Sequence, residues 1–230
     1  MTVRAIIQAR MGSSRLRGKT LSPINGVPLL KRVVHTVEQL GICDEICIAT
    51  SNLEEDDPIE AYASGMLTCS VVRGDSEDVF SRFLAGCDGL HNNDSIVRIT
   101  ADNMFYQPDV CRELLAKHVA QQDDYTGIEG LSHLASEFIR VGAFRKVDHK
   151  ELTAYDKEHV TPYFIQHPRL FKTSLIAPST FGLQQNLDCK LTVDSLEDRI
   201  RIEELLQVFQ LAQPPFNRAD LYSYLESKQK

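Results

Sequence analysis

The sequence has no apolar run that approaches the roughly 18 residues needed to span a bilayer. Its first residues, Met1-Thr2-Val3-Arg4, lack the apolar stretch of a signal peptide. We therefore expect a cytoplasmic protein that does not insert into a membrane.

Paired cysteines of the metal-binding kind are also missing. None of the six cysteines forms a CxxC pair, and five of them lie inside apolar runs. Cys43 and Cys47 are spaced CxxxC, and no histidine with ligand spacing follows them, so we do not expect a zinc site. We interpret the cysteines as small reduced core residues.

The chain has no excess of positive charge. Twenty-five Lys and Arg against 32 Asp and Glu give a net charge of −7, which argues against a protein that coats nucleic acid or an anionic membrane. Any anionic ligand must therefore meet a local basic patch. With 230 residues and 43% apolar side chains, the chain is long enough for one large domain or one domain with an appended lobe.

Short apolar runs alternate with amphipathic stretches through the first half, which is the order typical of β-α-β units in a parallel sheet. The pattern predicts strands at 3–9, 46–50, 69–73 and 94–100. It predicts helices at 28–40, 54–64, 76–87 with Ser76 as N-cap, 109–119, 196–212 and 219–226. Residues 123–190 are more irregular, with β-like pieces at 137–141 and 170–177. We expect an α/β fold with a mostly parallel central sheet, helices on both faces and a partly inserted smaller lobe.

The loop after the first expected strand is the most informative segment. Residues 10–19 contain glycine and serine together with four cations, Arg10, Arg15, Arg17 and Lys19. Ligands of α/β sheets bind at the carboxyl ends of the strands, so a phosphate chain would lie at this loop. Arginine and lysine are natural partners of phosphate oxygens. The alternative is a solvated basic loop.

Standard nucleotide motifs are absent around this loop. Gly18-Lys19-Thr20 looks like the end of a Walker A motif, but five residues rather than four separate Gly12 from Gly18. The GxGxxG fingerprint that would indicate NAD binding is also absent. A nucleotide-sugar-dependent glycosyltransferase would require an Asp-x-Asp metal motif, which the sequence lacks. We interpret the acidic run Glu55-Asp56-Asp57 as a solvated start of a helix.

The segment from Arg10 to Lys19 resembles the signature loop of the sugar-acid cytidylyltransferases. The likeness is to the spore-coat polysaccharide (SpsF-type) branch, which is related to the CMP-Kdo and CMP-sialic acid synthetases. Further segments match in register, namely 73–79, 98–102, 158–163 and 192–198. The resemblance covers most of the chain. It implies one Rossmann-like nucleotidyltransferase domain, 1–230, with a nucleotide-binding core at about 1–122 and 190–230 and an acceptor and dimerisation lobe at about 123–189.

The same resemblance implies Mg²⁺-dependent transfer of CMP from the co-substrate CTP to a sugar acid or related sugar, with release of pyrophosphate, in polysaccharide or glycan biosynthesis. Attack on the α-phosphate develops negative charge on the phosphoryl oxygens, so cations and metal belong there. By resemblance, Arg10 and Lys19 are catalytic and neutralise the α- and β-phosphates. The implied nucleotide-binding residues are Gln8, Ala9, Arg10, Ser13, Arg15, Lys19, Arg73, Gly74, Ser76, Thr100 and Ala101. The resemblance implies a homodimer. It implies no nucleic acid partner.

Two carboxylates are candidate metal ligands. Asp102 and Asp194 each follow a β-like run, 96–101 and 191–193, which places both at the ligand-binding edge if the strands run parallel. Together they suit one Mg²⁺, which takes one or two carboxylates and completes its shell with water and phosphate oxygens. Alternatively, Asp102 caps a turn or helix, and Asp194 is the N-cap of the helix at 196 with Glu197 as capping-box partner.

The expected acceptor-binding residues are Glu137 and His159. His159 either lines an acceptor pocket or bonds a phosphate, and the alternative is that it satisfies a buried backbone carbonyl. Residues 130–138 depart from the family pattern, with Ala135 at an acidic position, so the acceptor's identity stays open. A catalytically altered nucleotide-binding or regulatory homologue and a nucleotide-sugar-dependent glycosyltransferase remain alternatives. The poorly patterned apolar segment from about 125 to 181 also favours a homodimer.

Overall fold

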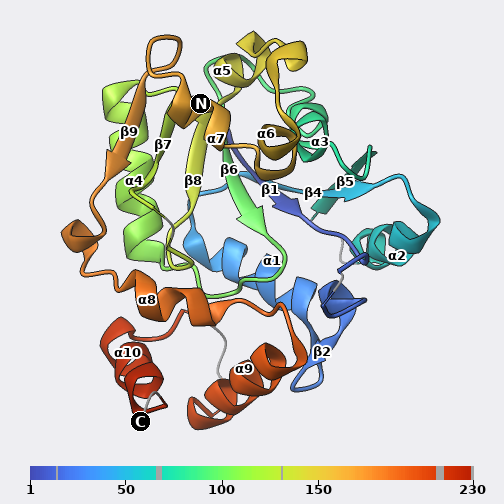
Figure 1. Ribbon diagram of the computed structural model, residues 1–230, viewed down its shortest axis with the longest axis vertical. Coiled ribbons are helices and arrows are strands. Elements are labelled where there is room, and N and C mark those ends of the chain that lie inside the picture. Colours follow the sequence, from blue (N-terminus) through green and yellow to red (C-terminus); the bar gives the residue numbers. More distant parts are fainter. Residues whose placement is uncertain (14, 66–68, 131, 211–214, 229–230) are drawn as a thin grey trace.

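A seven-stranded sheet forms the centre of the computed structural model, which describes residues 1–13, 15–65, 69–130, 132–210 and 215–228. Across the sheet the strands follow the order β5 (Cys69–Gly74), β4 (Glu45–Ser51), β1 (Val3–Gln8), β6 (Ser95–Thr100), β8 (Glu137–Arg140), β7 (Tyr125–Ile128) and β9 (Thr173–Ile176) (Figure 1). Only β8 pairs antiparallel with its neighbours, and the other neighbouring strands pair parallel. The predicted mostly parallel sheet is confirmed.

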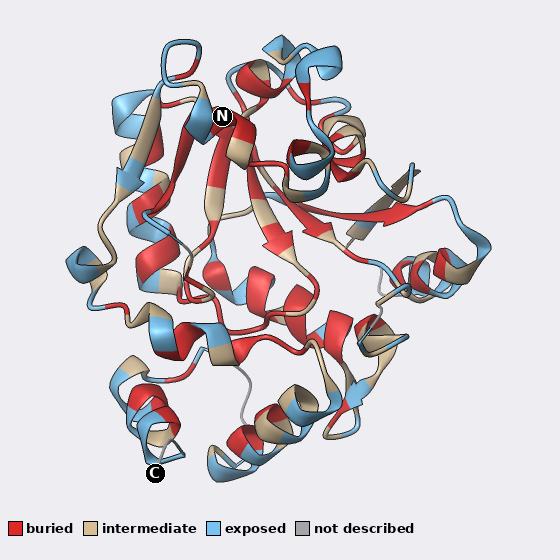
Figure 2. Ribbon diagram, in the orientation of Figure 1, coloured by how far each residue is buried: buried red, intermediate tan, exposed pale blue. Residues whose placement is uncertain are grey.

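The central strands are buried on both faces, as Figure 2 shows. In β1, Ala5 and Ile7 face one hydrophobic cluster and Ile6 between them faces the other. In β6, Val97 and Ile99 face the first cluster and Ile96 the second. Strands covered on both faces are apolar at nearly every position, which explains why they read as continuous apolar runs in the sequence.

Helices cover both faces. The cluster on one face includes residues of α1 (Leu29–Leu40), α2 (Asp57–Gly65), α4 (Pro108–Gln121), α9 (Leu196–Val208) and α10 (Arg218–Ser227). The other face packs on α3 (Val79–Ala85), α5 (Val141–Lys146) and α7 (Pro162–Gln166). The short helix α6 (Ala154–His159) contacts α3 and α7. There the ring of Phe144 lies 4.4 Å from that of Phe80 and 5.4 Å from that of Phe164, measured between centroids. The predicted helices on both faces are confirmed.

Short elements connect these layers. They are the hairpin strands β2 (Pro23–Ile24) and β3 (Val27–Pro28), the helix α8 (Gln185–Asp188), and the 3₁₀ turns η1 (Lys19–Leu21), η2 (Glu54–Asp56), η3 (His149–Glu151), η4 (Pro178–Phe181) and η5 (Cys189–Leu191). No helix in the described part of the chain is long and apolar enough to cross a membrane.

Three sequence predictions differ from the structure. The N-cap of α3 is Asp78 and not Ser76, because the Asp78 carboxylate accepts a hydrogen bond from the Ser81 amide at 2.9 Å. Residues 191–193 do not form a parallel strand, since they follow η5 and make only an isolated antiparallel bridge between Thr192 and Asn103. α9 ends at Val208, and the predicted end of this helix at 212 lies outside the described residues.

The segment from 123 to 189 contributes β7, β8 and β9 to the same central sheet as the first half of the chain. Its irregular sequence pattern reflects strands of four residues each, with the short helices α5, α6 and α7 between β8 and β9. The sheet is therefore continuous across the predicted boundary between core and lobe. The separate roles of the core in nucleotide binding and of the lobe in acceptor binding and dimerisation stay predictions.

One buried histidine ties α4 to the sheet. His118 is fully buried, and its ring nitrogens lie 3.0 Å from the hydroxyls of Ser95 and Thr126. Burial lowers the pKa of His118 to about 4, so the ring is neutral at pH 7.

We predict that stability falls as the pH drops from about 6.5 toward 4, because His118 binds a proton in the unfolded chain before it does so in the folded protein. The pKa of about 4, against 6.5 for a free histidine, corresponds to a loss on the order of 3 kcal/mol below pH 4. The free energy of unfolding, measured with urea at several pH values, should depend less steeply on pH for His118→Gln than for the wild type. His35→Gln is the control, because the His35 side chain is 41% exposed, and it should keep the wild-type dependence of unfolding free energy on pH. An equal dependence in all three proteins would contradict the prediction.

Candidate active site

The basic loop between β1 and η1 folds back on itself. The amides of Ser13 and Gly18 donate to the Met11 carbonyl at 2.8 and 2.9 Å, and the Thr20 hydroxyl donates to the Arg10 carbonyl at 2.7 Å. Gly18 has φ +74°, a left-handed conformation that glycine adopts without strain. These bonds fix the turn that leads into Lys19.

A buried carboxylate holds this loop against the sheet. Asp56 is 1% exposed and accepts hydrogen bonds from the Met11 amide at 2.6 Å, the Ser51 amide at 3.2 Å and the Ser51 hydroxyl. The prediction that the acidic run at 55–57 is solvated is therefore wrong for Asp56, because three donors compensate its burial. Its neighbours also have partners, since Glu55 pairs with Arg17 at 3.1 Å and Asp57 with Arg73 at 2.7 Å.

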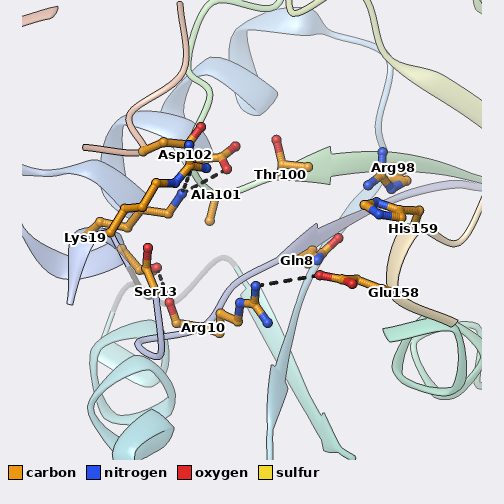
Figure 3. A pocket seen from close by; sticks show the side chains of 13 residues that line it. Gln8, Arg10, Ser13, Lys19, Arg98, Thr100, Ala101, Asp102, Glu158 and His159 are labelled. Atoms are coloured by element: carbon orange, nitrogen blue, oxygen red, sulfur yellow. Dashed lines mark hydrogen bonds and ion pairs between the residues drawn. The ribbon is translucent and has the colours of Figure 1, made fainter. Parts of the chain in front are cut away.

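The loop borders a cavity of about 240 Å³ at the carboxyl ends of β1 and β6 (Figure 3). It is lined by most of the predicted nucleotide and metal residues, namely Gln8, Arg10, Ser13, Arg15, Lys19, Thr100, Ala101, Asp102 and Asp194, and by the predicted acceptor residue His159. Thr20, Arg98 and Glu158 complete the lining. The Arg10 guanidinium lies 4.0 Å from the Glu158 carboxylate.

The centre of this cavity is a lysine between two aspartates. Lys19 Nζ lies 3.1 Å from Asp102 Oδ2 and 2.8 Å from Asp194 Oδ1, and an Arg15 nitrogen lies 3.2 Å from the same Asp194 oxygen. Partial burial alone would raise the pKa of Asp194, but the hydrogen bond and charge of Lys19 outweigh it and lower that pKa below its usual value. Both carboxylates therefore converge on one point.

A backbone hydrogen bond, and not a parallel strand, places Asp194 beside Asp102. The Val193 amide donates to the Asp102 carbonyl at 3.0 Å, which ties the two acidic segments together. Ser195 is the N-cap of α9, and Asp198 is its capping-box partner. The alternative that Asp194 caps this helix with Glu197 is therefore wrong. Asp102 does lie in a turn after β6, and its carboxylate contacts Lys19.

Four predicted nucleotide residues lie outside the lining that the described residues form: Ala9, Arg73, Gly74 and Ser76. The Arg73 guanidinium bonds Glu60 at 2.8 Å, Asp57 at 2.7 Å and two backbone carbonyls of residues 51 and 53 at 2.8 Å, which joins β5 to α2. Ala9 is buried, and its amide donates to the Ala49 carbonyl at 3.0 Å. The nucleotide contacts of these four residues stay predictions.

A second and larger cavity, of about 610 Å³, adjoins the first. The two share five lining residues, namely Arg98, Thr100, Asp102, His159 and Asp194. The larger cavity adds the predicted acceptor residue Glu137 and further residues of the altered segment, among them Ser132, His133, Ala135 and Ser136. The two cavities therefore meet at these five residues.

A tight turn places His159 at the junction of the cavities. Val160 has φ +70°, and the Thr161 amide donates to the His159 carbonyl at 2.8 Å, which is the geometry of a γ-turn. Such a conformation is rare for a β-branched residue and is typical of functional sites. The His159 ring lies 4.3 Å from that of Tyr155, and within the described chain it bonds no backbone carbonyl. That alternative is not supported.

Sequence reasoning gave no role to several lining residues, among them Arg98, Asn103, Tyr106 and His133. A signal for Arg98 was present, because residues 98 and 100 alternate along β6 and so share one face, and Asp102 follows in the next turn. His133 and Tyr106 come to the cavity only through the tertiary fold. Burial lowers the pKa of His133, so a neutral ring faces the cavity.

The cytidylyltransferase family model matches residues 4–226. The chain belongs to the cytidylyltransferase family. It is 35% identical over 211 residues, 88% of this chain and 85% of the relative, to the spore coat polysaccharide biosynthesis protein SpsF of Bacillus subtilis. This cytidylyltransferase family member is a nucleotidyltransferase that uses CTP.

Solved structures share the fold of this cytidylyltransferase. A cytidylyltransferase from Leptospira borgpetersenii superposes with a TM-score of 0.84 at 23% identity, covering 100% of this chain and 95% of that one. A CMP:2-keto-3-deoxy-manno-octonic acid synthetase complexed with CTP gives a TM-score of 0.63 at 14% identity, covering 90% and 99%. The predicted Rossmann-like nucleotidyltransferase fold is confirmed.

We predict that Lys19→Ala and Arg10→Ala each reduce turnover by about 10²-fold or more, because each removes a preorganised positive charge from the first cavity. Pyrophosphate release measures this effect, and circular dichroism checks folding. Arg17→Pro is the control, since Arg17 is 80% exposed and pairs with Glu55. Its CTP affinity, measured by calorimetry, should stay within about threefold of the wild type. Normal turnover in folded Lys19→Ala and Arg10→Ala proteins would show that the loop is only a solvated surface.

Proposed function

We propose that this protein transfers CMP from CTP to a sugar acid or related sugar and releases pyrophosphate, with Mg²⁺ as the metal. The observation that carries the proposal is the convergence of Asp102 and Asp194 on Lys19 inside a cavity that Arg10 and Arg15 also line. The similarity to a spore coat polysaccharide biosynthesis protein supports a role in polysaccharide or glycan assembly.

The charges of the first cavity suit a triphosphate. In-line attack on the α-phosphate places negative charge on the phosphoryl oxygens and on the leaving pyrophosphate. Arg10, Arg15 and Lys19 provide fixed positive charge on the side of the loop. Preorganised charge of this kind stabilises the transition state without reorganisation during the reaction.

The donor set also fits Mg²⁺. Two carboxylates and space for phosphate oxygens and water match its usual coordination. In the described residues no cluster of three or more His, Cys, Asp or Glu is placed to hold a metal, which is consistent with an ion bound largely by nucleotide and water. Asp102 and Asp194 would hold the ion, and when bound it supplies positive charge to the phosphate oxygens. The contacts with Lys19 direct the two carboxylates to one point, and Lys19 lowers the pKa of Asp194.

We assign the acceptor to the second cavity. Several described residues between 128 and 137 and between 155 and 165 line much of it, and they belong to the predicted acceptor lobe. The first cavity is lined mainly by the predicted core. The junction at Thr100, Asp102 and His159 would bring the acceptor hydroxyl to the α-phosphate. This placement supports the division into core and acceptor lobe.

We further propose a cytoplasmic homodimer. CTP is a cytoplasmic nucleotide, and the six cysteines are unpaired. Leu170 and Leu175 are 61% and 38% exposed, and they lie just before and within the edge strand β9. An exposed edge strand with apolar side chains favours pairing with a second copy. Light scattering that gives 25.9 kDa over a wide concentration range would exclude the dimer.

A pyrophosphate-release screen tests the proposed reaction. The four nucleoside triphosphates are each combined with a panel of sugar acids, neutral sugars and phosphorylated small alcohols, with and without Mg²⁺. We expect release only with CTP, Mg²⁺ and a sugar acid or related sugar. CTP binding without turnover on any acceptor would favour the catalytically altered homologue. Turnover of a nucleotide-sugar in place of CTP would favour the glycosyltransferase.

We predict that Asp102→Asn and Asp194→Asn each lower turnover by about 10²-fold or more with little change in melting temperature, because asparagine keeps the size but removes the charge that holds the metal. The double variant should resemble the worse single one, since either change already destroys a shared site. Asp198→Asn, at the capping partner of Ser195, is the control and should affect melting more than turnover. Strictly multiplicative losses in the double variant would exclude a shared metal.

A further inference from the structure

Arg98 lies at the junction of the two cavities and has no role so far. It is in the middle of β6, its side chain is 15% exposed, and it lines both the first and the second cavity. Figure 3 shows its guanidinium beside His159. A guanidinium is always charged at physiological pH, so this position carries a fixed positive charge.

Two residues of the neighbouring strands hold Arg98. Glu137 is its register partner on β8, and Arg98 Nη1 donates to Glu137 Oε2 at 2.7 Å. The Tyr125 hydroxyl donates to the other oxygen, Glu137 Oε1, at 2.6 Å. Burial and the Glu137 charge raise the pKa of Tyr125 well above its usual value, so the phenol stays protonated and remains a donor. Both oxygens of Glu137 are thus already bonded within the protein.

Arg98 itself is not saturated. The hydrogen bond from Nη1 to Glu137 is the one that Arg98 donates to the described residues. Its Nε is buried without a partner among them. Arg98 is the only arginine or lysine among the described residues that line the second cavity, whereas Asp102 and Asp194 there are already paired with Lys19. Glu137 balances the charge of Arg98, but a buried guanidinium with donors that lack partners is unfavourable, and the oxygens of an acidic ligand would supply further acceptors.

We propose that Arg98 binds the carboxylate of an acidic acceptor in the second cavity, and that Glu137 and Tyr125 are positioning residues that orient it. This inference rests on the proposed function and narrows its acceptor to an acid. Guanidinium and carboxylate groups pair through strong charge-assisted hydrogen bonds. Glu137 acts through Arg98, which replaces the expectation that it contacts the acceptor directly.

The test uses the whole protein with its nucleotide site saturated by CTP and Mg²⁺. Glycolate is the carboxylate probe, glycolamide its neutral counterpart and glycerol phosphate a phosphate probe, all followed by ligand-observed NMR. We expect the wild type to bind glycolate at least about tenfold more tightly than glycolamide, and Arg98→Met to lose that preference. Arg4→Met is the matched control, because Arg4 is also 15% exposed and pairs with a glutamate, Glu45, but does not line either cavity. It should retain the wild-type preference.

Glu137→Gln gives a second readout that keeps Arg98 in place. Loss of the negative charge should leave glycolate affinity about twofold or more higher, because the cation is then less compensated. A direct acceptor contact by Glu137 would predict the opposite sign. This variant also decides the matter if Arg98→Met does not fold.

Several results would overturn the inference. They are equal binding of glycolate and glycolamide, no glycolate binding in the millimolar range, a preference that survives in folded Arg98→Met, or binding of glycerol phosphate but not glycolate. Calorimetry with CTP alone separates this from the proposed function. A wild type that fails to bind CTP would count against CMP transfer, whereas normal CTP binding with no acid preference would count only against Arg98.

Discussion

The contact of Lys19 with Asp102 and Asp194 joins three segments that are far apart in the sequence: the basic loop, the end of β6 and the start of α9. A half-buried carboxylate beside another is unfavourable unless a cation compensates both. The lysine does so with its side chain only 12% exposed, and the Val193 to Asp102 backbone bond fixes the spacing of the acidic segments. The position of the C-terminal helices therefore depends on the same charge balance that forms the cavity.

The sheet was predictable because burial on both faces leaves an unbroken apolar signal in β1, β4 and β6. The ends of elements were less predictable, since competing caps lie side by side: Asp78 caps α3 although Ser76 also had the right chemistry. Asp56 shows a second limit. Its burial depends on donors from Met11 and Ser51, and charge patterning alone cannot reveal such partners.

The candidate site was predictable where its residues lie in one loop or at the end of one strand, as Arg10 to Lys19 and Thr100 to Asp102 do. The site was less predictable where a motif residue pairs with neighbouring residues of the protein. Arg73 lies near the end of β5 in the expected motif, yet its guanidinium pairs with Asp57 and Glu60. The acceptor side depends on contacts between β6, β8 and the turn at Val160, and one strand's sequence carries no record of its register partner.

Charge balance also explains how a chain of net charge −7 could bind anions in the two cavities, as proposed above. Each Arg or Lys among the described residues that line them has a carboxylate within 4.0 Å: Lys19 contacts two aspartates and Arg98 contacts Glu137, while Arg15 pairs with Asp194 and Arg10 with Glu158. These carboxylates keep the cations in place in the free protein and limit the self-repulsion of neighbouring positive charge. An acidic acceptor beside a triphosphate would otherwise be repelled at short range. Arg98 at the junction would offset that repulsion where the two anions approach, which is a reason for a fixed cation there and not in the outer wall of the cavity.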